Sequence, residues 1–232
     1  FGGRLAQAGV DVTFLVRPAR AALLERQGLV IRSPLGDANF PVHTVTQADG
    51  HYDAVLLSCK AYDLDSAMHA IAPAVGPQTL LLPLLNGLRH FDVLDDRFGR
   101  PRVLGGLCHI GVTLADDGAI QHLNTLQRLA LGAREPSQVA GAAALHAVLA
   151  RGGFRPVLAE SVMQELWDKF VFLASAAGMT TLMRASIGAI LAAQEGQALM
   201  LEMLECCRAV AAANGYAPGE QAWAWMVEHV SD

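Results

Sequence analysis

The sequence is poor in cysteine and contains no run of basic residues. Its four cysteines form no Cys-x-x-Cys pair and have no histidine at zinc-ligand spacing, so we expect no metal site. This pattern is typical of a reducing compartment, and we expect a cytoplasmic protein. The net charge is -5 at pH 7, and the lack of a basic patch argues against a nucleic-acid-binding or membrane-surface protein.

Long hydrophobic runs and a conventional start are also lacking. The most hydrophobic window, residues 170–183, is bounded by Lys169 and Arg184 and is shorter than the roughly 20 residues that span a bilayer, so it is expected to be core. The chain starts at Phe1 with neither a methionine nor a strand-forming run before its first helical residues, and residues 228–232 end it without a clear terminator. We therefore expect both termini to be clipped.

The composition that is present favours a large core, because 53% of the residues are hydrophobic and 17% are charged. Apolar runs alternate with helical patterns up to about residue 158, and only helical patterns follow. This order predicts an α/β, Rossmann-like dinucleotide-binding domain over residues 1–155 and an all-helical domain over residues 156–232. Strands are expected at 11–17, 51–60, 79–85, 102–112, 119–122 paired with 129–131, and 154–158, and helices at 19–27, 63–72, 136–150, 161–177, 186–191, 195–214 and 218–230.

Three polar residues follow buried strands of the predicted sheet. Arg17, Lys60 and Asn86 each stand where a strand reaches the carboxyl edge, which is where open α/β sheets bind ligands. An arginine at the end of the second strand of a dinucleotide-binding unit accommodates the 2′-phosphate of NADP. The alternatives remain open: Arg17 and Lys60 could simply begin the next helix, and Asn86-Gly87 could be a tight turn.

One lysine interrupts the apolar helix predicted around residues 165–177. Lys169 shares its face with Leu166 and Leu173, and aromatic residues cover the opposite side, so we expect the helix to be buried. The lysine could form a helical ion pair with Glu165, four residues earlier. Alternatively, a partly desolvated ammonium has a lowered pKa and can exchange a proton with a substrate.

The combination of these motifs resembles the ketopantoate reductase family over almost the whole chain. The resemblance implies an NADPH-dependent reduction of 2-dehydropantoate to (R)-pantoate, with Lys169 as the general acid. It also implies that Asn86 contacts both substrate and nicotinamide ribose and that Arg17 and Lys60 hold the adenosine end of the cofactor. The family's first strand and its Gly-x-Gly-x-x-Gly fingerprint are absent here, as are the contacts expected beyond Asp232. The motifs occur in the family's order at residues 12–17, 58–61, 85–87, 118–122 and 166–169.

Two positions depart from the family pattern. Leu173 and Ala177 stand where members carry substrate-binding asparagines, and a missing buried hydrogen-bond partner costs about 1–3 kcal/mol. We expect Arg184 or Ser186 to supply polar substrate contacts, or else Thr180 or Thr181, with Arg184 favoured because a guanidinium binds a carboxylate bidentately. A related reductase of another 2-keto acid, or a non-catalytic dinucleotide-binding protein, is therefore an alternative.

The helical region also bears on assembly. Residues 195–214 place Leu199, Met203 and Val210 on one stripe, and Trp223 and Met226 mark a second apolar face. Most of this surface is expected to be core. The resemblance implies that such faces can also form a homodimer.

Overall fold

The computed structural model describes residues 1–48 and 50–231, and it divides into two compact units. The sheet unit comprises Phe1–Leu85 and Arg89–Glu160, and the helical unit comprises Asn86–Leu88 and Ser161–Asp232. Asp49 and Asp232, the last position of the predicted helical domain, lie outside the described residues. The units separate after Glu160, whereas the sequence places the boundary at residue 155. The predicted order of an α/β region followed by helices is confirmed.

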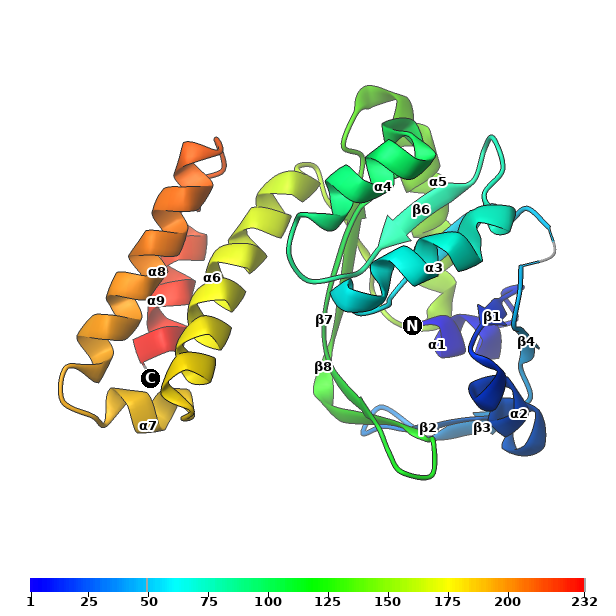
Figure 1. Cartoon of the computed structure of the whole chain (residues 1–232), viewed down its shortest axis with the longest axis horizontal. Coiled ribbons are helices and arrows are strands. Elements are labelled where there is room, and N and C mark those ends of the chain that lie inside the picture. The colour runs from blue at the N-terminus through cyan, green and yellow to red at the C-terminus, as the bar shows by residue number, and fades with distance from the viewer. Residues whose placement is uncertain (49, 232) are drawn as a thin grey trace. The chain divides into compact units, whose positions relative to one another are not determined.

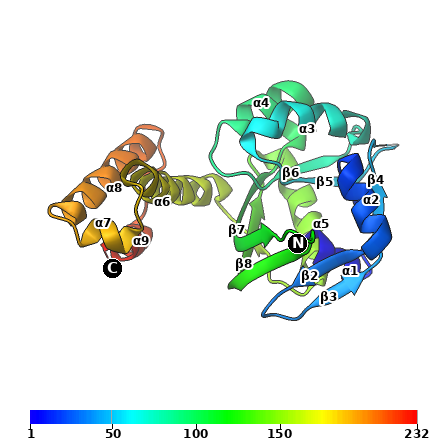
Figure 2. The same ribbon diagram turned by 60° about the horizontal axis from the view of Figure 1, so that its bottom comes forward.

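Two parallel strand pairs lie in the first part of the sheet unit. The strand β1 (Thr13–Leu15) pairs with β4 (His43–Val45), and β5 (Ala54–Leu57) pairs with β6 (Leu80–Pro83). The apolar sequences of β5 and β6 suit strands that are covered on both faces. Figures 1 and 2 show α3 (Leu64–Ile71) and α4 (His90–Phe98) on one side of this pair and α5 (Val139–Leu149) on the other.

A five-stranded sheet completes the unit around one long strand. Along its path the order is β3 (Ala38–Phe40), β2 (Leu29–Arg32), β8 (Ile120–Gly132) and β7 (Gly105–Leu114), and β9 (Val157–Leu158) also pairs with β8. β8 is parallel to β2 at its start and parallel to β9 at its end, and it runs antiparallel to β7. β8 therefore joins β2, β7 and β9 into one sheet.

The prediction that residues 119–122 and 129–131 form a pair of strands is wrong, because residues 120–122 and 129–131 both belong to β8. The partner of β8 is β7, and the predicted turn at residues 116–118 joins them, with the Gly118 N–H donating to the Ala115 carbonyl at 2.8 Å. The register shifts beside Gly111, so that residues 123–126 bulge out of the pairing. The His122 ring holds this bulge, since its Nε2 lies 3.0 Å from the Leu126 carbonyl.

The helices of the sheet unit cover a core rich in leucine. The main cluster unites Leu82, Leu104 and Leu131 from the strands with Leu149 of α5 and Leu5 of α1 (Gly2–Gln7). A second cluster packs α2 (Pro18–Gln27) against β2 and β3. The helix α4 was absent from the sequence prediction. Close packing also fixes the strand crossing, because a Cβ on Gly106 of β7 would lie 2.5 Å from the Pro83 carbonyl oxygen of β6.

The helical unit consists of α6 (Val162–Met183), α7 (Ile187–Leu191), α8 (Gly196–Ala213) and α9 (Glu220–Ser231). Helices at all four predicted positions are confirmed, although α6 continues past residue 177 to Met183. Its core joins Val171 and Met179 of α6 to Met200 and Leu204 of α8 and Met226 of α9. Figure 1 shows α6, α8 and α9 side by side with α7 across one end. Among the described residues, no helix is long and apolar enough to cross a bilayer.

Candidate functional site

Two of the predicted cofactor residues lie at the carboxyl ends of strands in the sheet unit. Arg17 follows β1 in an extended conformation and caps α2, whose first residue, Pro18, has a ring that suits a helix start. Lys60 follows β5, also in an extended conformation, and precedes the short 3-10 helix η1 (Ala61–Asp63). Both side chains are exposed, so their charges are accessible to a ligand.

An ion pair connects these two loops. Arg17 Nη2 donates to Asp63 Oδ1 at 3.0 Å, and 79% of the arginine side chain and 33% of the aspartate side chain are exposed. A pair this exposed contributes about 0–1 kcal/mol to stability. Sequence reasoning missed Asp63, although its position three residues after Lys60 was visible. Tyr62, between them, is 85% exposed and presents its ring to solvent.

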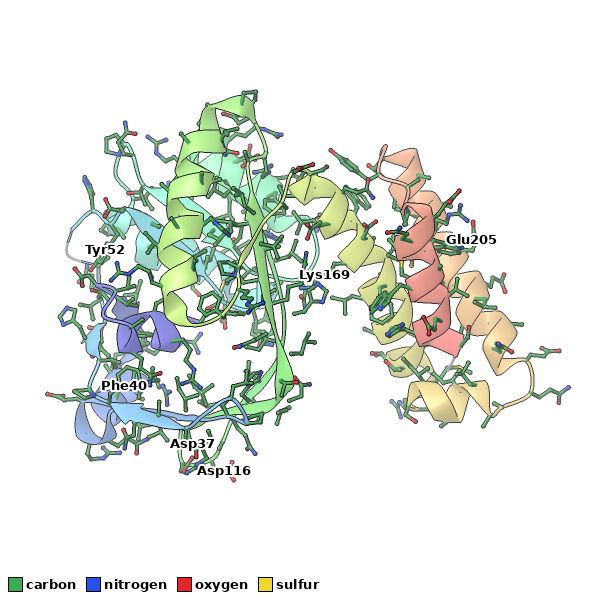
Figure 3. All side chains as sticks on the ribbon, turned by 180° about the vertical axis from the view of Figure 1, so that it is seen from behind. Asp37, Phe40, Tyr52, Asp116, Lys169 and Glu205 are labelled. Carbon is green, nitrogen blue, oxygen red and sulfur yellow. The ribbon has the colours of Figure 1, made fainter. Side chains whose placement is uncertain are left out.

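The second arginine of this region, Arg20, has a structural role. Its Nη1 donates to the Gly118 carbonyl at 2.6 Å in the β7–β8 turn, and burial lowers the pKa of its guanidinium. Gln27 donates to the Asp117 carbonyl of the same turn at 3.1 Å, and Arg32 forms an ion pair with the Asp117 side chain. Figure 3 shows this end of the sheet unit, where Asp116 is labelled. Arg20 thus fastens α2 to the turn instead of joining the carboxyl edge.

The cysteine at the carboxyl edge is unsuited to nucleophilic chemistry. Cys59 lies between β5 and Lys60 and is half-buried, and this burial raises the pKa of its thiol. A thiol with a raised pKa stays protonated at neutral pH. All four cysteines are thiols. Among residues 1–48 and 50–231, no group of three His, Cys, Asp or Glu residues could hold a metal ion.

Lys169 lies on α6 and is half-buried (Figure 3). The predicted burial of this helix holds in part. The fully buried residues of α6 are Val162, Leu166, Val171, Ser175, Ala176 and Met179, and most other positions up to residue 176 are half-buried. Trp167, Val171 and Met179 belong to the core of the helical unit. Lys169 lies about 160° around the helix from both Trp167 and Val171, and about 80° from Met179. The lysine is therefore placed on the side of α6 opposite Trp167 and Val171.

Polar residues near Lys169 are held by local hydrogen bonds. Gln164 Nε2 donates to Asp168 Oδ1 at 2.9 Å and also to the carbonyls of Tyr216 and Ala217. Burial raises the pKa of Asp168, which this hydrogen bond partly opposes. Gln164 therefore attaches α6 to the segment before α9.

The predicted substrate residues on α6 and α7 differ in availability. Ser186 caps α7, and its Oγ accepts from the Ala189 N–H at 3.3 Å. Thr180 Oγ1 donates to the Ala176 carbonyl at 2.8 Å. Arg184 ends α6 in the left-handed conformation, with φ of 51°, and its side chain is exposed. Leu173 is half-buried and Ala177 is exposed on the same helix. Arg184, Ser186 and Thr181 are therefore all exposed, whereas Thr180 is half-buried.

Asn86 follows β6 in the chain but belongs to the helical unit together with Gly87 and Leu88. It is exposed, and Gly87 has φ of 86°, which the predicted turn at this pair requires. Asn86 and Lys169 are thus members of one compact unit, and Arg17 and Lys60 are members of the other.

A buried cluster that the sequence did not reveal fixes α4, the helix that follows Asn86. Arg134 binds Asp95 of α4 through two hydrogen bonds of 2.7 and 2.8 Å, and its guanidinium lies 4.5 Å from the centre of the Phe91 ring. His90, at the start of α4, is buried, and burial together with the Arg134 charge lowers its pKa to about 4. The Arg134–Asp95 contact joins residues about 40 positions apart, so no local sequence pattern predicts it.

Comparisons with known proteins agree with this architecture. Residues 1–136 match the family model described as Ketopantoate reductase PanE/ApbA, and residues 161–232 match the model of its C-terminal domain, Ketopantoate reductase PanE/ApbA C terminal. The uncharacterized oxidoreductase YkpB of Bacillus subtilis (strain 168) is 34% identical over 197 residues. That match covers 84% of this chain and 65% of YkpB, so the chain spans slightly less than two thirds of that relative.

Solved structures show the same fold. The 2-dehydropantoate 2-reductase of Geobacter metallireducens GS-15 superposes with a TM-score of 0.89 at 26% identity, covering 99% of this chain and 77% of that chain. D-mandelate dehydrogenase with NADH and anilino(oxo)acetate superposes with a TM-score of 0.87 at 17% identity, covering 99% of this chain and 74% of that chain, which shows the fold alone. The chain belongs to the ketopantoate reductase family.

Proposed function

We propose that this protein reduces a 2-keto acid with NADPH, by default 2-dehydropantoate to (R)-pantoate as a step toward pantothenate and coenzyme A. The sheet unit would be the cofactor-binding domain, and the helical unit would carry the substrate residues and support a homodimer in the cytoplasm. Membership of the ketopantoate reductase family supports the reaction class. The observation that carries the proposal is the half-buried Lys169 on α6, in the same compact unit as Asn86.

The residues at the carboxyl edge of the sheet unit suit the phosphorylated end of NADPH. Arg17 and Lys60 bring two accessible positive charges to the ends of β1 and β5. A guanidinium can give a phosphate two parallel hydrogen bonds, and an ammonium adds a point charge. When bound, the cofactor supplies the hydride that the keto carbon accepts.

Lys169 would act as the general acid. Reduction of a ketone leaves negative charge on its oxygen, and an ammonium within hydrogen-bond reach can donate the proton that neutralises it. Lys169 is half-buried on α6, so its ammonium is only partly accessible to solvent. Asn86 can hold two partners, because its amide carries both a donor and an acceptor.

Arg184 is the proposed partner of the substrate carboxylate. It is exposed, whereas Ser186 already accepts a backbone hydrogen bond at the start of α7. A reductase of a different 2-keto acid is the second candidate, and the apolar Leu173 and Ala177 favour it. Neither side chain can replace a hydrogen-bonding asparagine, so a substrate with fewer polar groups near this helix would fit them better.

A panel of 2-keto acids tests the proposal in the full-length protein. We expect NADPH consumption with 2-dehydropantoate or with another branched 2-keto acid, and we expect Arg184→Ala to raise KM for the preferred acid. Ser186→Ala, at the other predicted substrate residue, is measured beside it and should raise KM less. NADPH binding without consumption for any acid would contradict the enzymatic assignment, and an unchanged KM in Arg184→Ala would contradict the role of Arg184.

A further inference from the structure

The carboxyl edge of the sheet unit holds two side chains that dinucleotide-binding sheets ordinarily use as alternatives. An acidic residue accepts a hydrogen bond from the ribose 2′-hydroxyl of NADH, whereas an arginine accommodates the 2′-phosphate of NADPH. Here Arg17 and Asp63 are both present, and they contact each other, with Nη2 and Oδ1 3.0 Å apart. The acid comes from η1 after β5 and the arginine from the end of β1.

The contact leaves most of Arg17 accessible to a ligand. Its guanidinium has five N–H donors, and 79% of the side chain remains exposed beside Asp63. A phosphate bound to this guanidinium would lie close to a carboxylate that is bound to it already. Two negative groups that share one cation repel each other, and Lys60, which follows β5 as Asp63 does, adds a second positive charge to this edge.

We propose that Asp63 is a specificity-determining residue, which weakens the preference of this edge for a 2′-phosphorylated nucleotide and allows NADH to bind alongside NADPH. The inference rests on the proposed function, because it takes Arg17 as the residue that recognises the 2′-phosphate. For NADH, the 2′-hydroxyl donates to the Asp63 carboxylate. For NADPH, the 2′-phosphate accepts from Arg17 and Lys60 while Asp63 repels it.

The opposite role for Asp63 makes an opposite prediction. If the carboxylate only held Arg17 in a conformation that favours phosphate binding, its removal would weaken the binding of a 2′-phosphorylated nucleotide. The sign of the effect therefore separates specificity from positioning. A general loss of structure would weaken both kinds of nucleotide together.

Isothermal titration calorimetry with two nicotinamide-free probes tests the proposal. The probes are adenosine 2′,5′-bisphosphate and adenosine 5′-monophosphate, each titrated into the full-length wild-type protein and its Asp63→Asn variant. We expect the variant to bind the bisphosphate on the order of fivefold more tightly, as the loss of one exposed like charge predicts, and the monophosphate no more tightly. The ratio of the two dissociation constants is the quantity that changes.

Asp65→Asn is the matched control. Asp65 is an exposed acid two residues after Asp63, and its substitution removes the same charge from the start of α3. We expect it to leave the ratio unchanged. An equal shift in Asp65→Asn, weaker bisphosphate binding in Asp63→Asn, or a constant ratio would each overturn the inference while leaving the proposed reductase intact. If the wild-type protein bound neither probe, the cofactor edge of the proposed function would fail, and the inference would fail with it.

Discussion

Arg17 in the sheet unit leaves 79% of its side chain exposed, whereas Lys169 in the helical unit is half-buried on α6. An exposed cation can bind an anion with little change in its own hydration. A half-buried amine competes with fewer waters when it donates to a substrate oxygen. The comparison teaches that burial, not residue type, separates the cations proposed for binding from the one proposed for proton transfer.

The largest expected effect tests the buried side of this comparison. Lys169→Met should lower kcat by about 10²–10⁴-fold, because the variant keeps most of the side-chain volume but cannot donate a proton. Steady-state kinetics with a saturating keto acid measures kcat, and fluorescence quenching measures NADPH binding, which should change little. A variant that retained wild-type kcat would exclude Lys169 as the proton donor.

Breaking a buried ion pair sharpens the comparison in terms of stability. The Arg134 side chain is only 4% exposed, so Arg134→Met should leave Asp95 with only the more distant Arg100, 3.6 Å away, and lower the free energy of unfolding by up to about 3–5 kcal/mol. Urea denaturation measures this difference. Asp63→Asn, at the exposed Arg17 pair, is the control and should change stability by no more than about 1 kcal/mol. Equal losses in the two variants would remove the distinction between these pairs.

Buried His90 should make folding depend on pH. Its pKa is lowered to about 4 from the ordinary 6.5, so between these values the unfolded chain binds the proton and the folded protein does not. Stability from this residue is therefore complete above about pH 6.5 and falls by about 3 kcal/mol as the pH drops toward 4. Urea denaturation at a series of pH values should show a shallower acid slope for His90→Phe. An identical slope in both proteins would contradict this assignment.

The smallest effect concerns the exposed side of the comparison. Arg17→Ala should weaken NADPH binding by about tenfold, because a charge-assisted hydrogen bond to a phosphate is worth about 1.5–3 kcal/mol before competition with solvent. NADH lacks the 2′-phosphate and should bind much as before. Dissociation constants for both cofactors provide the measurement, and Arg26→Ala, on the same helix, is a control of equal charge. Equal weakening for NADH and NADPH would contradict 2′-phosphate recognition.

Much of the fold could be predicted because local patterns carry it. Apolar runs ending in Arg17, Lys60 and Asn86 identified β1, β5 and β6, and the change to helical periodicity identified the helical unit. The helix α4 was not predicted, although its buried residues His90, Phe91 and Leu94 have helical spacing. The continuity of β8 escaped because its bulge exposes residues 123–126, so the strand pattern appears to stop there.

The sequence indicated a candidate site residue only where that residue stands out from its neighbours along the chain. Lys169 and Arg17 stand out within their own segments, as a charge in an apolar helix or at the end of a strand. Asp63 matters because it forms an ion pair with Arg17, which is 46 residues away, and Arg134 matters because it forms one with the distant Asp95. Contacts between distant segments depend on the packing of the whole unit, and no window of sequence contains them.

The shared pairing of β8 has a consequence for the way the sheet unit opens. β2, β7 and β9 all depend on this one strand, and its residues Leu129–Leu131 are fully buried. Their amides cannot reach solvent through fraying of a single edge, so they should exchange hydrogen only when the unit unfolds as a whole. We therefore expect the amides of Leu129–Leu131 to exchange most slowly in the sheet unit. The amides of the exposed bulge at residues 123–126, within the same strand, should exchange early.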